Sequence, residues 1–283
     1  MFVCTESYHK MVETTTKHDS PNSDLQKSDF SKDSGIKNDW LTVAALGVLA
    51  MCVVSFDHEA LGHGGACLLL GGHIQLLTSS LFRCDVPSKW IDAGGPAMNL
   101  LLGLLALIAR TLMPLRFPKI RFFLTLMTAF SFFWEGGYLI HAMHRQDGDL
   151  YFFTQSLLGH VTVAERWFGA GLGLALYLAT VRLTSRALLT AAPSGKTARA
   201  TARTAWLAAT LGIIIATAAG RWRGLSDAVM EIGLASFPLL IIPRSKRELP
   251  GTLSSPAIAH SYPAIALGVI VFIVFVAILG RGI

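Results

Sequence analysis

The sequence predicts an all-α polytopic membrane protein with six or seven transmembrane helices and a small membrane-associated hairpin after the first. Hydrophobic residues make up 52% of the 283 residues and charged residues only 15%, well below the roughly one quarter that soluble domains average. Uncharged apolar stretches of about the length that a helix needs to cross a bilayer recur along the chain. We therefore expect an integral, multi-pass protein whose main surroundings are the lipid bilayer.

Six stretches fit membrane-spanning helices: 40–56, 93–109, 122–134, 167–181, 205–220 and 264–280. A further stretch, 224–243, contains Asp227 and Glu231. These two acidic residues are four apart and share a helix face, so they line a water-filled cavity or pair with arginines such as Arg221. Whether this stretch crosses decides between six and seven helices. A crossing puts Arg244, Lys246 and Arg247 on the same side as the other basic loops, and this agreement supports seven.

The first 39 residues are rich in Ser, Thr, Asp and Lys and lack the apolar run of a secretory signal. This composition is typical of a disordered tail. Basic residues gather at 116–121 and 182–203, and one helix per predicted span puts both loops on the same side. Because cytoplasmic loops carry the excess of Lys and Arg, the tail is expected in the cytosol and residues 72–90 at the opposite face. The net charge of +6 does not indicate nucleic acid, since basic residues do not interleave with aromatic ones.

Residues 72–90 alternate irregularly in hydropathy and have turn residues, 78–80, in their middle, which predicts a short hairpin. An open strand edge is not tolerated in lipid, so the hairpin must lie against protein or at the interface. The four cysteines show no CxxC spacing. We therefore expect no disulfide framework.

Asp57, His58, Glu59 and His63 lie within seven positions, on a helix that continues out of the first apolar stretch. Charged and polar groups at bilayer depth are costly and usually mark function. A single histidine there would be explained as a hydrogen-bonded core residue. Four such groups together predict a functional site.

The segment HEALGH, residues 58–63, resembles the zinc-binding HExxH helix with one extra residue between the histidines. In a regular helix, residues four apart differ by about 40° around the axis, but residues five apart differ by about 140°. A π-bulge absorbs one extra residue, and Gly62 is where the backbone deforms at least cost. His58 and His63 would then bind one zinc ion, with Glu59 as general base. HExxGH of the dipeptidyl peptidase III family is similar over these six residues.

Two other ligand sets stay open. Glu59 and His63 are four apart on one helix face, so both could bind the metal, and His58 would then support them without touching the metal. Cys67 lies four residues beyond His63 and could reach a metal as a thiolate. A buried cysteine more commonly packs as a small hydrophobic side chain.

Two segments further along complete a pattern: AGGPAMNLLL (93–102) opens one apolar stretch and QDGDL (146–150) follows another. Together with the histidine helix, they resemble the site-2 protease family of intramembrane zinc metalloproteases. That family has HExxH on one helix, GPxxN opening the next, and an Asp-Gly motif that supplies the third zinc ligand. LLLGGHIQLL (68–77) is also similar to the segment leading into the family's hairpin. The resemblance covers roughly residues 41–155.

The resemblance implies that His58, His63 and Asp147 bind zinc and that Glu59 is the catalytic base. Two histidines and a carboxylate suit a catalytic zinc, which leaves its fourth position open. The chain departs from the family in the extra residue of HEALGH and in the Arg-Gln that stands where the family has Asn-Pro. Asp149 could therefore be the third ligand in place of Asp147.

The resemblance also places Asn99 beside the active site, where it could hydrogen-bond an extended substrate or serve as a helix-packing amide. The Gly-Gly-Pro at 94–96 is expected at a helix entry, since Pro favours the first turn. Glu135 is a candidate proton carrier or a partner for His141. For His141 and His144 we expect an interfacial or hydrogen-bonding role.

The domain organisation that follows is a disordered cytosolic tail (1–39), a metallopeptidase-like three-helix membrane core (40–160) and additional transmembrane helices (161–283). The resemblance implies a zinc metalloprotease that hydrolyses peptide bonds of membrane-spanning protein substrates. A noncatalytic scaffold or transporter that retains the fold is the alternative. The sequence gives no oligomeric state.

Overall fold

The computed structural model describes residues 38–192, 194–222, 224–241 and 256–283. These residues are mostly helical, which confirms the predicted all-α polytopic membrane fold. The tail predicted for residues 1–39 lies outside the described part of the chain, apart from its last two residues.

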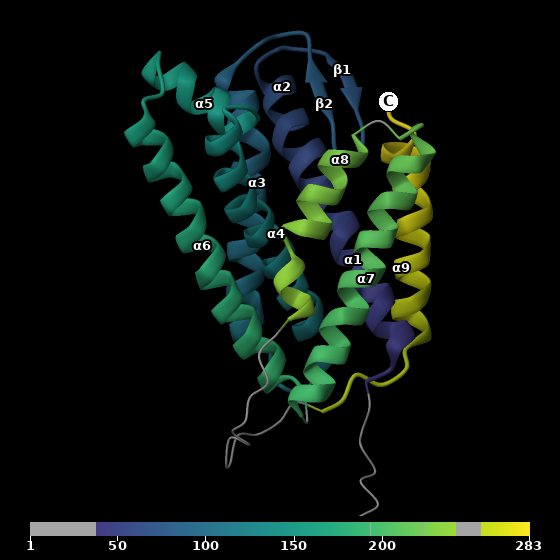
Figure 1. The fold of residues 1–283 in the computed structure, drawn as a ribbon. Helices are drawn as coiled ribbons and strands as arrows, with labels where there is room; N and C mark the ends of the chain where they lie inside the picture. The colour runs from purple at the N-terminus through teal and green to yellow at the C-terminus, as the bar shows by residue number, and fades with distance from the viewer. Residues whose placement is uncertain (1–37, 193, 223, 242–255) are drawn as a thin grey trace, which may run out of the picture. The chain divides into compact units, whose positions relative to one another are not determined.

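Six helices in the described residues are long and apolar enough to cross a membrane (Figure 1). The first, Trp40–Leu69, consists of α1 (Trp40–Phe56), a π-helical segment η1 (Asp57–Gly64) and α2 (Gly65–Leu69). The next four are α3 (Lys89–Leu112), α4 (Pro118–Arg145), α6 (Val163–Thr190) and α7 (Gly195–Ala219). The last consists of α9 (Tyr262–Phe275) and η4 (Val276–Gly280). A shorter helix, α5 (Asp149–Leu158), connects α4 to α6.

Polar side chains begin several of these helices. Asp39 accepts a hydrogen bond from the Thr42 N–H at 2.8 Å at the start of α1. Thr162 and Glu165 form a reciprocal capping box at the start of α6. Such bonds satisfy N–H groups that the first turn of a helix leaves free. The helix starts are therefore encoded locally.

The helix α1 packs against α4, α7 and α9, while α3 packs against η1 and α4, and α6 packs against α4. The core between them is apolar, and its largest fully buried side chains include Trp134, Phe130 and Met51. Large apolar side chains such as Leu172 and Ile270 are instead more than half exposed. A membrane supplies the apolar surroundings that these outer faces require.

The stretch 224–243 does not form a continuous span. Its described part consists of α8 (Leu225–Ala228), the π-helical η2 (Val229–Leu234) and the 3-10 helix η3 (Phe237–Leu240). This series begins at the end of the bundle that carries the strands (Figure 1) and packs against α4 and α7. The Trp206 ring N–H donates to the Gly233 carbonyl at 2.9 Å. The described residues therefore hold six full spans and one interrupted segment.

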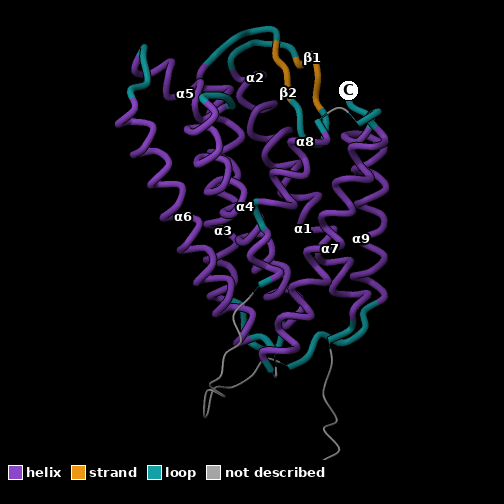
Figure 2. Tube along the Cα trace, viewed as in Figure 1, coloured by secondary structure: helices purple, strands orange, loops and turns teal. Residues whose placement is uncertain are grey.

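The predicted hairpin is present as two antiparallel strands, β1 (Ile74–Leu77) and β2 (Phe82–Cys84), shown in orange in Figure 2. Its turn is buried against protein, as the sequence requires. Ser55 Oγ donates to the Ser79 carbonyl at 2.6 Å, and Ser80 Oγ donates to the Gly224 carbonyl at 3.1 Å. The backbone of Leu77 exchanges two hydrogen bonds with Ile283.

The expectation that no disulfide forms is wrong. Cys67 at the end of α2 and Cys84 at the end of β2 are bonded, and their Cα atoms lie 6.1 Å apart. This separation is within the usual range for a disulfide. A search for CxxC spacing does not detect this pair, because the hairpin folds back and brings together two cysteines that are 17 positions apart. Cys52 is a free, buried cysteine.

The prediction that Gly94, Gly95 and Pro96 form a helix entry is also wrong. The helix α3 begins earlier, at Lys89, and Ser88 caps it. The glycines instead let two backbones touch. A Cβ atom on Gly94 would lie 2.5 Å from the Gly62 carbonyl oxygen, and one on Gly62 would lie 2.5 Å from the Gly95 Cα. Side chains at these positions would push α3 away from η1.

Candidate metal centre

The HEALGH segment lies in η1, where the backbone follows a π-helix from Asp57 to Gly64. Hydrogen bonds in a π-helix run from residue i to residue i+5. His58 and His63, which are five apart, therefore lie one turn apart on the same side. The predicted π-type distortion is confirmed, although it covers eight residues rather than a single bulge. Gly62 contributes close packing against α3.

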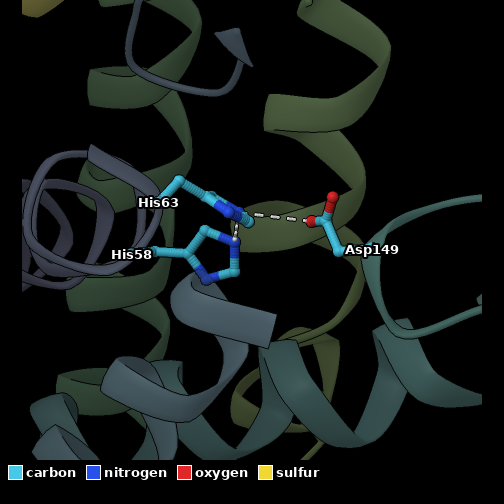
Figure 3. Close-up of side chains that lie close together, drawn as sticks. All are labelled: His58, His63 and Asp149. Carbon is cyan, nitrogen blue, oxygen red and sulfur yellow. Dashed lines mark hydrogen bonds and ion pairs between the residues drawn. The ribbon is translucent and has the colours of Figure 1, made fainter. Parts of the chain in front are cut away.

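Three ligand-type atoms from two elements converge at this point (Figure 3). The Nε2 atoms of His58 and His63 are 3.2 Å apart. The His63 Nε2 atom lies 3.3 Å from Oδ2 of Asp149, the first residue of α5. Both histidines are buried and Asp149 is partly exposed. The arrangement brings together three of the residues singled out in the sequence.

Hydrogen bonds on the far side of each ring decide what the convergent atoms are. His63 Nδ1 lies 2.7 Å from the Ile91 carbonyl oxygen, which can only accept, so this nitrogen carries the proton. His58 Nδ1 lies 3.2 Å from a carboxylate oxygen of Glu135, which matches a proton on this nitrogen, and 3.5 Å from the Asn99 amide nitrogen. In the neutral imidazole the Nε2 atom is then an acceptor. With both rings neutral and protonated at Nδ1, the two Nε2 atoms and the Asp149 carboxylate are acceptors that face one another, and a proton or a metal ion between them would stabilise this arrangement.

The separations fit zinc. A tetrahedral zinc ion with bonds of about 2.0–2.1 Å to nitrogen and oxygen holds its ligand atoms about 3.3 Å apart. The two separations described above, 3.2 and 3.3 Å, match this value. Two histidines and one carboxylate are also a donor set that catalytic zinc sites use. The side chains therefore fit a zinc ion in both chemistry and spacing.

The backbone of α3 closes one side of the cluster. A Cβ atom on Gly95 would lie 2.3 Å from His63 Nε2 and 2.6 Å from His58 Nε2. Only glycine leaves room for both ring nitrogens at this position. The Gly-Gly-Pro motif thus contributes to the site because Gly95 has no side chain to displace the two rings.

Glu135 contacts the His58 ring at Nδ1, on the side that faces away from the cluster. Its Oε1 atom accepts a hydrogen bond from Asn99 Nδ2 at 2.8 Å and lies 3.2 Å from His58 Nδ1. The Trp134 ring stacks on the His58 ring, with centroids 4.3 Å apart and planes inclined by 16°. A carboxylate behind a ligating histidine fixes its tautomer and orientation. Glu135 contacts His58 and Asn99, and no contact with His141 is observed among the described residues.

Asn99 is fully buried and does not line the cavity described below. Its amide acts on the site through Glu135. The structure thus places Asn99 as a positioning residue, whereas the sequence left open a direct role in substrate binding. The amide oxygen of Asn99 has no partner among the described residues.

The two aspartates of QDGDL separate in the fold. Asp147 is exposed, and its Oδ1 atom accepts the Gly148 N–H at 2.9 Å. Asp149 points at His63 and is held by Tyr138, whose hydroxyl donates to Oδ2 at 3.2 Å and accepts the Asp149 N–H at 3.0 Å. Burial would raise the pKa of Asp149, but a His63 ring that carries protons on both nitrogens donates to this carboxylate and places a positive charge beside it, which holds the pKa below its usual value. The structure therefore favours Asp149 over Asp147 as third ligand.

A cavity of about 810 Å³ opens beside the cluster. His58, Glu59 and His63 form one wall, and residues of β2, α4 and η2 form the others. Glu59 is 3% exposed and has no hydrogen-bond partner among the described residues. A buried carboxylate without a partner on a cavity wall is available to exchange a proton with a molecule that enters. Asp227 and Glu231 also line the cavity, which is one of the two roles expected for them.

Sequence reasoning missed Tyr138, Gly95 and Phe82. The Phe82 ring stacks on the His63 ring, with centroids 5.6 Å apart. Gly95 was assigned to a helix entry, and no spacing pattern connects the other two to the histidines. For Glu135 a signal existed, namely a carboxyl group within an apolar helix. Its partner could not be found from the sequence, because His58 lies on a different helix.

Fold and site together define a polytopic α-helical membrane protein with a buried His-His-Asp cluster on a cavity wall. No protein-family model, curated protein or solved structure matches the chain.

Proposed function

We propose that the protein is an intramembrane zinc metalloprotease that hydrolyses peptide bonds of membrane-spanning substrates. The observation that carries this proposal is the convergence of three acceptor atoms at zinc-like spacing within a membrane-spanning bundle. Glu59 lies on the same cavity wall, in the helix segment that holds both histidines. A general base beside a metal is the minimum that such hydrolysis requires.

When bound by His58, His63 and Asp149, zinc would supply a Lewis acid and lower the pKa of water. Glu59 accepts a proton from the attacking water, whose oxygen bonds to the carbonyl carbon of the substrate. Glu59 then delivers that proton to the amide nitrogen as the C–N bond breaks. The products are a carboxylic acid and an amine, so one water molecule is consumed.

Asn99 and Glu135 act on this reaction by holding the His58 ring. Glu135 keeps the proton on Nδ1, so that Nε2 remains free to bind the metal. Trp134 fixes the plane of the ring by stacking. The Ile91 carbonyl does the same for His63. These contacts are made before any substrate binds, so the cluster is preorganised.

The substrate must enter the cavity in an extended form. Carbonyl groups of a membrane-spanning helix are occupied by its own hydrogen bonds, so the helix must unwind locally before a carbonyl can be attacked. The polar groups that line the cavity, among them Ser88 and Asp92, give the unwound backbone hydrogen-bonding partners. We therefore expect cleavage near the end of a substrate helix, where unwinding costs least.

The proposal is tested with purified full-length protein in lipid nanodiscs, by measuring zinc content and cleavage of a single-span reporter peptide. Glu59→Gln should keep zinc and lower the cleavage rate by about 10²- to 10⁴-fold, the usual contribution of a general base. His63→Ala should lose both zinc and cleavage. Asp147→Asn is the matched control, because this exposed carboxylate lies two residues from Asp149 and outside the cluster.

Two results would contradict the proposal. If the unmodified protein binds zinc but cleaves nothing, the noncatalytic scaffold or transporter is the better description. If Glu59→Gln cleaves as fast as the unmodified protein, Glu59 is not the base and the hydrolytic mechanism fails.

A further inference from the structure

The disulfide lies beside the cavity, which Cys84 lines together with both histidines. Cys67 is four residues beyond His63 on the same continuous helix, and Cys84 ends strand β2. The bond therefore ties the helix that carries His63 to the strand that forms a wall of the cavity. That strand touches the site directly, since the Phe82 ring stacks on the His63 ring.

The two ends of the hairpin are held in different ways. The turn end is fixed by buried hydrogen bonds to Ser55 and by bonds to Gly224 and Ile283. The open end is held by the disulfide and by three contacts between His73 and Asp85. These are an exposed ion pair of 3.0 Å, a hydrogen bond of 2.6 Å from the His73 N–H to Asp85 Oδ1 and one of 3.2 Å from the Asp85 N–H to the His73 carbonyl. Exposed ion pairs contribute little to stability. The His73–Asp85 hydrogen bonds join the two arms of the hairpin to each other, whereas the disulfide is the covalent link between the end of β2 and α2.

The two sulfur atoms differ in access. Cys67 is fully buried, whereas Cys84 is partly exposed and lines the cavity. An incoming thiolate would attack Cys84 Sγ and displace Cys67 as the leaving thiolate. Cys67, Cys84 and Asp85 also form a group with metal-ligand spacing, but in the disulfide state the two sulfurs are bonded to each other and are not free thiolates.

We propose that Cys67–Cys84 is a thiol–disulfide exchange site that controls how firmly strand β2 closes the cavity. Its co-reactant is a dithiol reductant, small or protein-borne. Two electrons and two protons pass from the dithiol to the Cys67–Cys84 bond, which yields two thiols here and one disulfide in the reductant. Reduction then releases residues 81–88 while the turn at 77–80 stays anchored.

The membrane orientation agrees with this chemistry. The hairpin end of the bundle lies opposite the loops that join α3 to α4 and α6 to α7 (Figure 1). Basic residues in and beside those loops predict that this end of the bundle faces the cytosol. The hairpin is then expected in a compartment outside the cytosol, where disulfides form and persist.

Hydrogen exchange of the full-length protein in nanodiscs tests the proposal without reference to zinc or cleavage. On reduction with dithiothreitol, amides in 81–88 should exchange at least about tenfold faster, while those in 77–80 should change little. Reoxidation should restore the slow exchange. Cys84→Ser should exchange fast with or without reductant. Cys52→Ser is the control, because it removes the free buried thiol and keeps the response to reductant.

Mass analysis after alkylation decides whether the bond is formed and broken under each condition. The proposal is overturned if the bond is broken and exchange in 81–88 is unchanged. It is also overturned if both cysteines are alkylated without reductant in protein isolated under oxidising conditions. If Cys84→Ser fails to fold, the reversible response of the unmodified protein still gives the answer.

Discussion

At the scale of single residues, the site could be predicted where its members are close in sequence. His58, Glu59 and His63 occupy one short helical segment, so spacing alone indicated a π-distorted metal helix. The aspartate that meets His63 could not be predicted in this way, because the orientation of QDGDL depends on how α4 ends. Gln146 adopts a left-handed conformation and Gly148 has φ of 90°. These two turns direct Asp149, rather than Asp147, toward His63.

The choice between the two aspartates gives the first prediction. Asp149→Asn should weaken zinc binding by at least about 100-fold, because it removes a ligand rather than a residue that supports a ligand. Asp147→Asn should leave the zinc dissociation constant within about twofold, since its oxygen contacts only the Gly148 N–H. Competitive titration with a zinc chelator measures both. Equal losses in the two variants would show that the cluster is assigned incorrectly.

The residue behind His58 gives the second prediction. Glu135→Gln keeps the size of the side chain but removes the charge that holds the proton on His58 Nδ1. Zinc affinity should fall by about 10- to 100-fold, as for other residues that support a ligand. Glu231→Gln, another acid on the cavity wall, is the matched control and should bind zinc as the unmodified protein does. Unchanged affinity in Glu135→Gln would remove Glu135 from the site.

At the scale of elements, the helices and the hairpin could be predicted from hydropathy and turn residues. The contacts between elements could not be predicted in this way. The position of α3 shows why. Its apolar stretch begins at Ala93, directly before the Gly-Gly-Pro motif, but Ser88 caps the helix more than one turn earlier. The glycines face η1, and a sequence does not reveal which helix a glycine touches. The Cys67–Cys84 pair was missed for the same reason.

The contact between α3 and η1 gives the third prediction. Gly95→Ala places a methyl group within 2.6 Å of the Nε2 atoms of His58 and His63. Because such a clash displaces the ligands themselves, zinc should be lost or bound at least about tenfold more weakly. Gly171→Ala is the control, because a Cβ atom there meets nothing within 4 Å. Zinc content and thermal unfolding should both be measured. A Gly95→Ala protein with normal zinc would mean that α3 lies further from the histidines.

At the scale of the whole molecule, composition and hydropathy were sufficient to predict a polytopic membrane protein, and six spanning helices confirm it. The stretch 224–243 was the uncertain part, since Asp227 and Glu231 interrupt its apolar character. In the described residues it is a broken series of short helices beside the cavity. Polar residues within an apolar stretch thus marked a cavity wall rather than a regular span.

The predicted orientation gives the fourth prediction. Gln75 lies in β1 of the hairpin, and Arg116 lies in the loop between α3 and α4, at the other end of the bundle (Figure 1). In intact cells or right-side-out vesicles, a membrane-impermeant maleimide should label Gln75→Cys directly and Arg116→Cys only after permeabilisation. The unmodified protein serves as the background control. The reverse pattern would invert the orientation and place the disulfide in the cytosol.

The central claim is that His58, His63 and Asp149 hold one zinc ion. Zinc X-ray absorption spectroscopy on the purified full-length protein tests it most directly. The expected spectrum shows only nitrogen and oxygen neighbours at about 2.0–2.1 Å, including two imidazoles. Zinc with sulfur neighbours at about 2.3 Å, or protein that takes up no zinc when supplied with it, would contradict the claim.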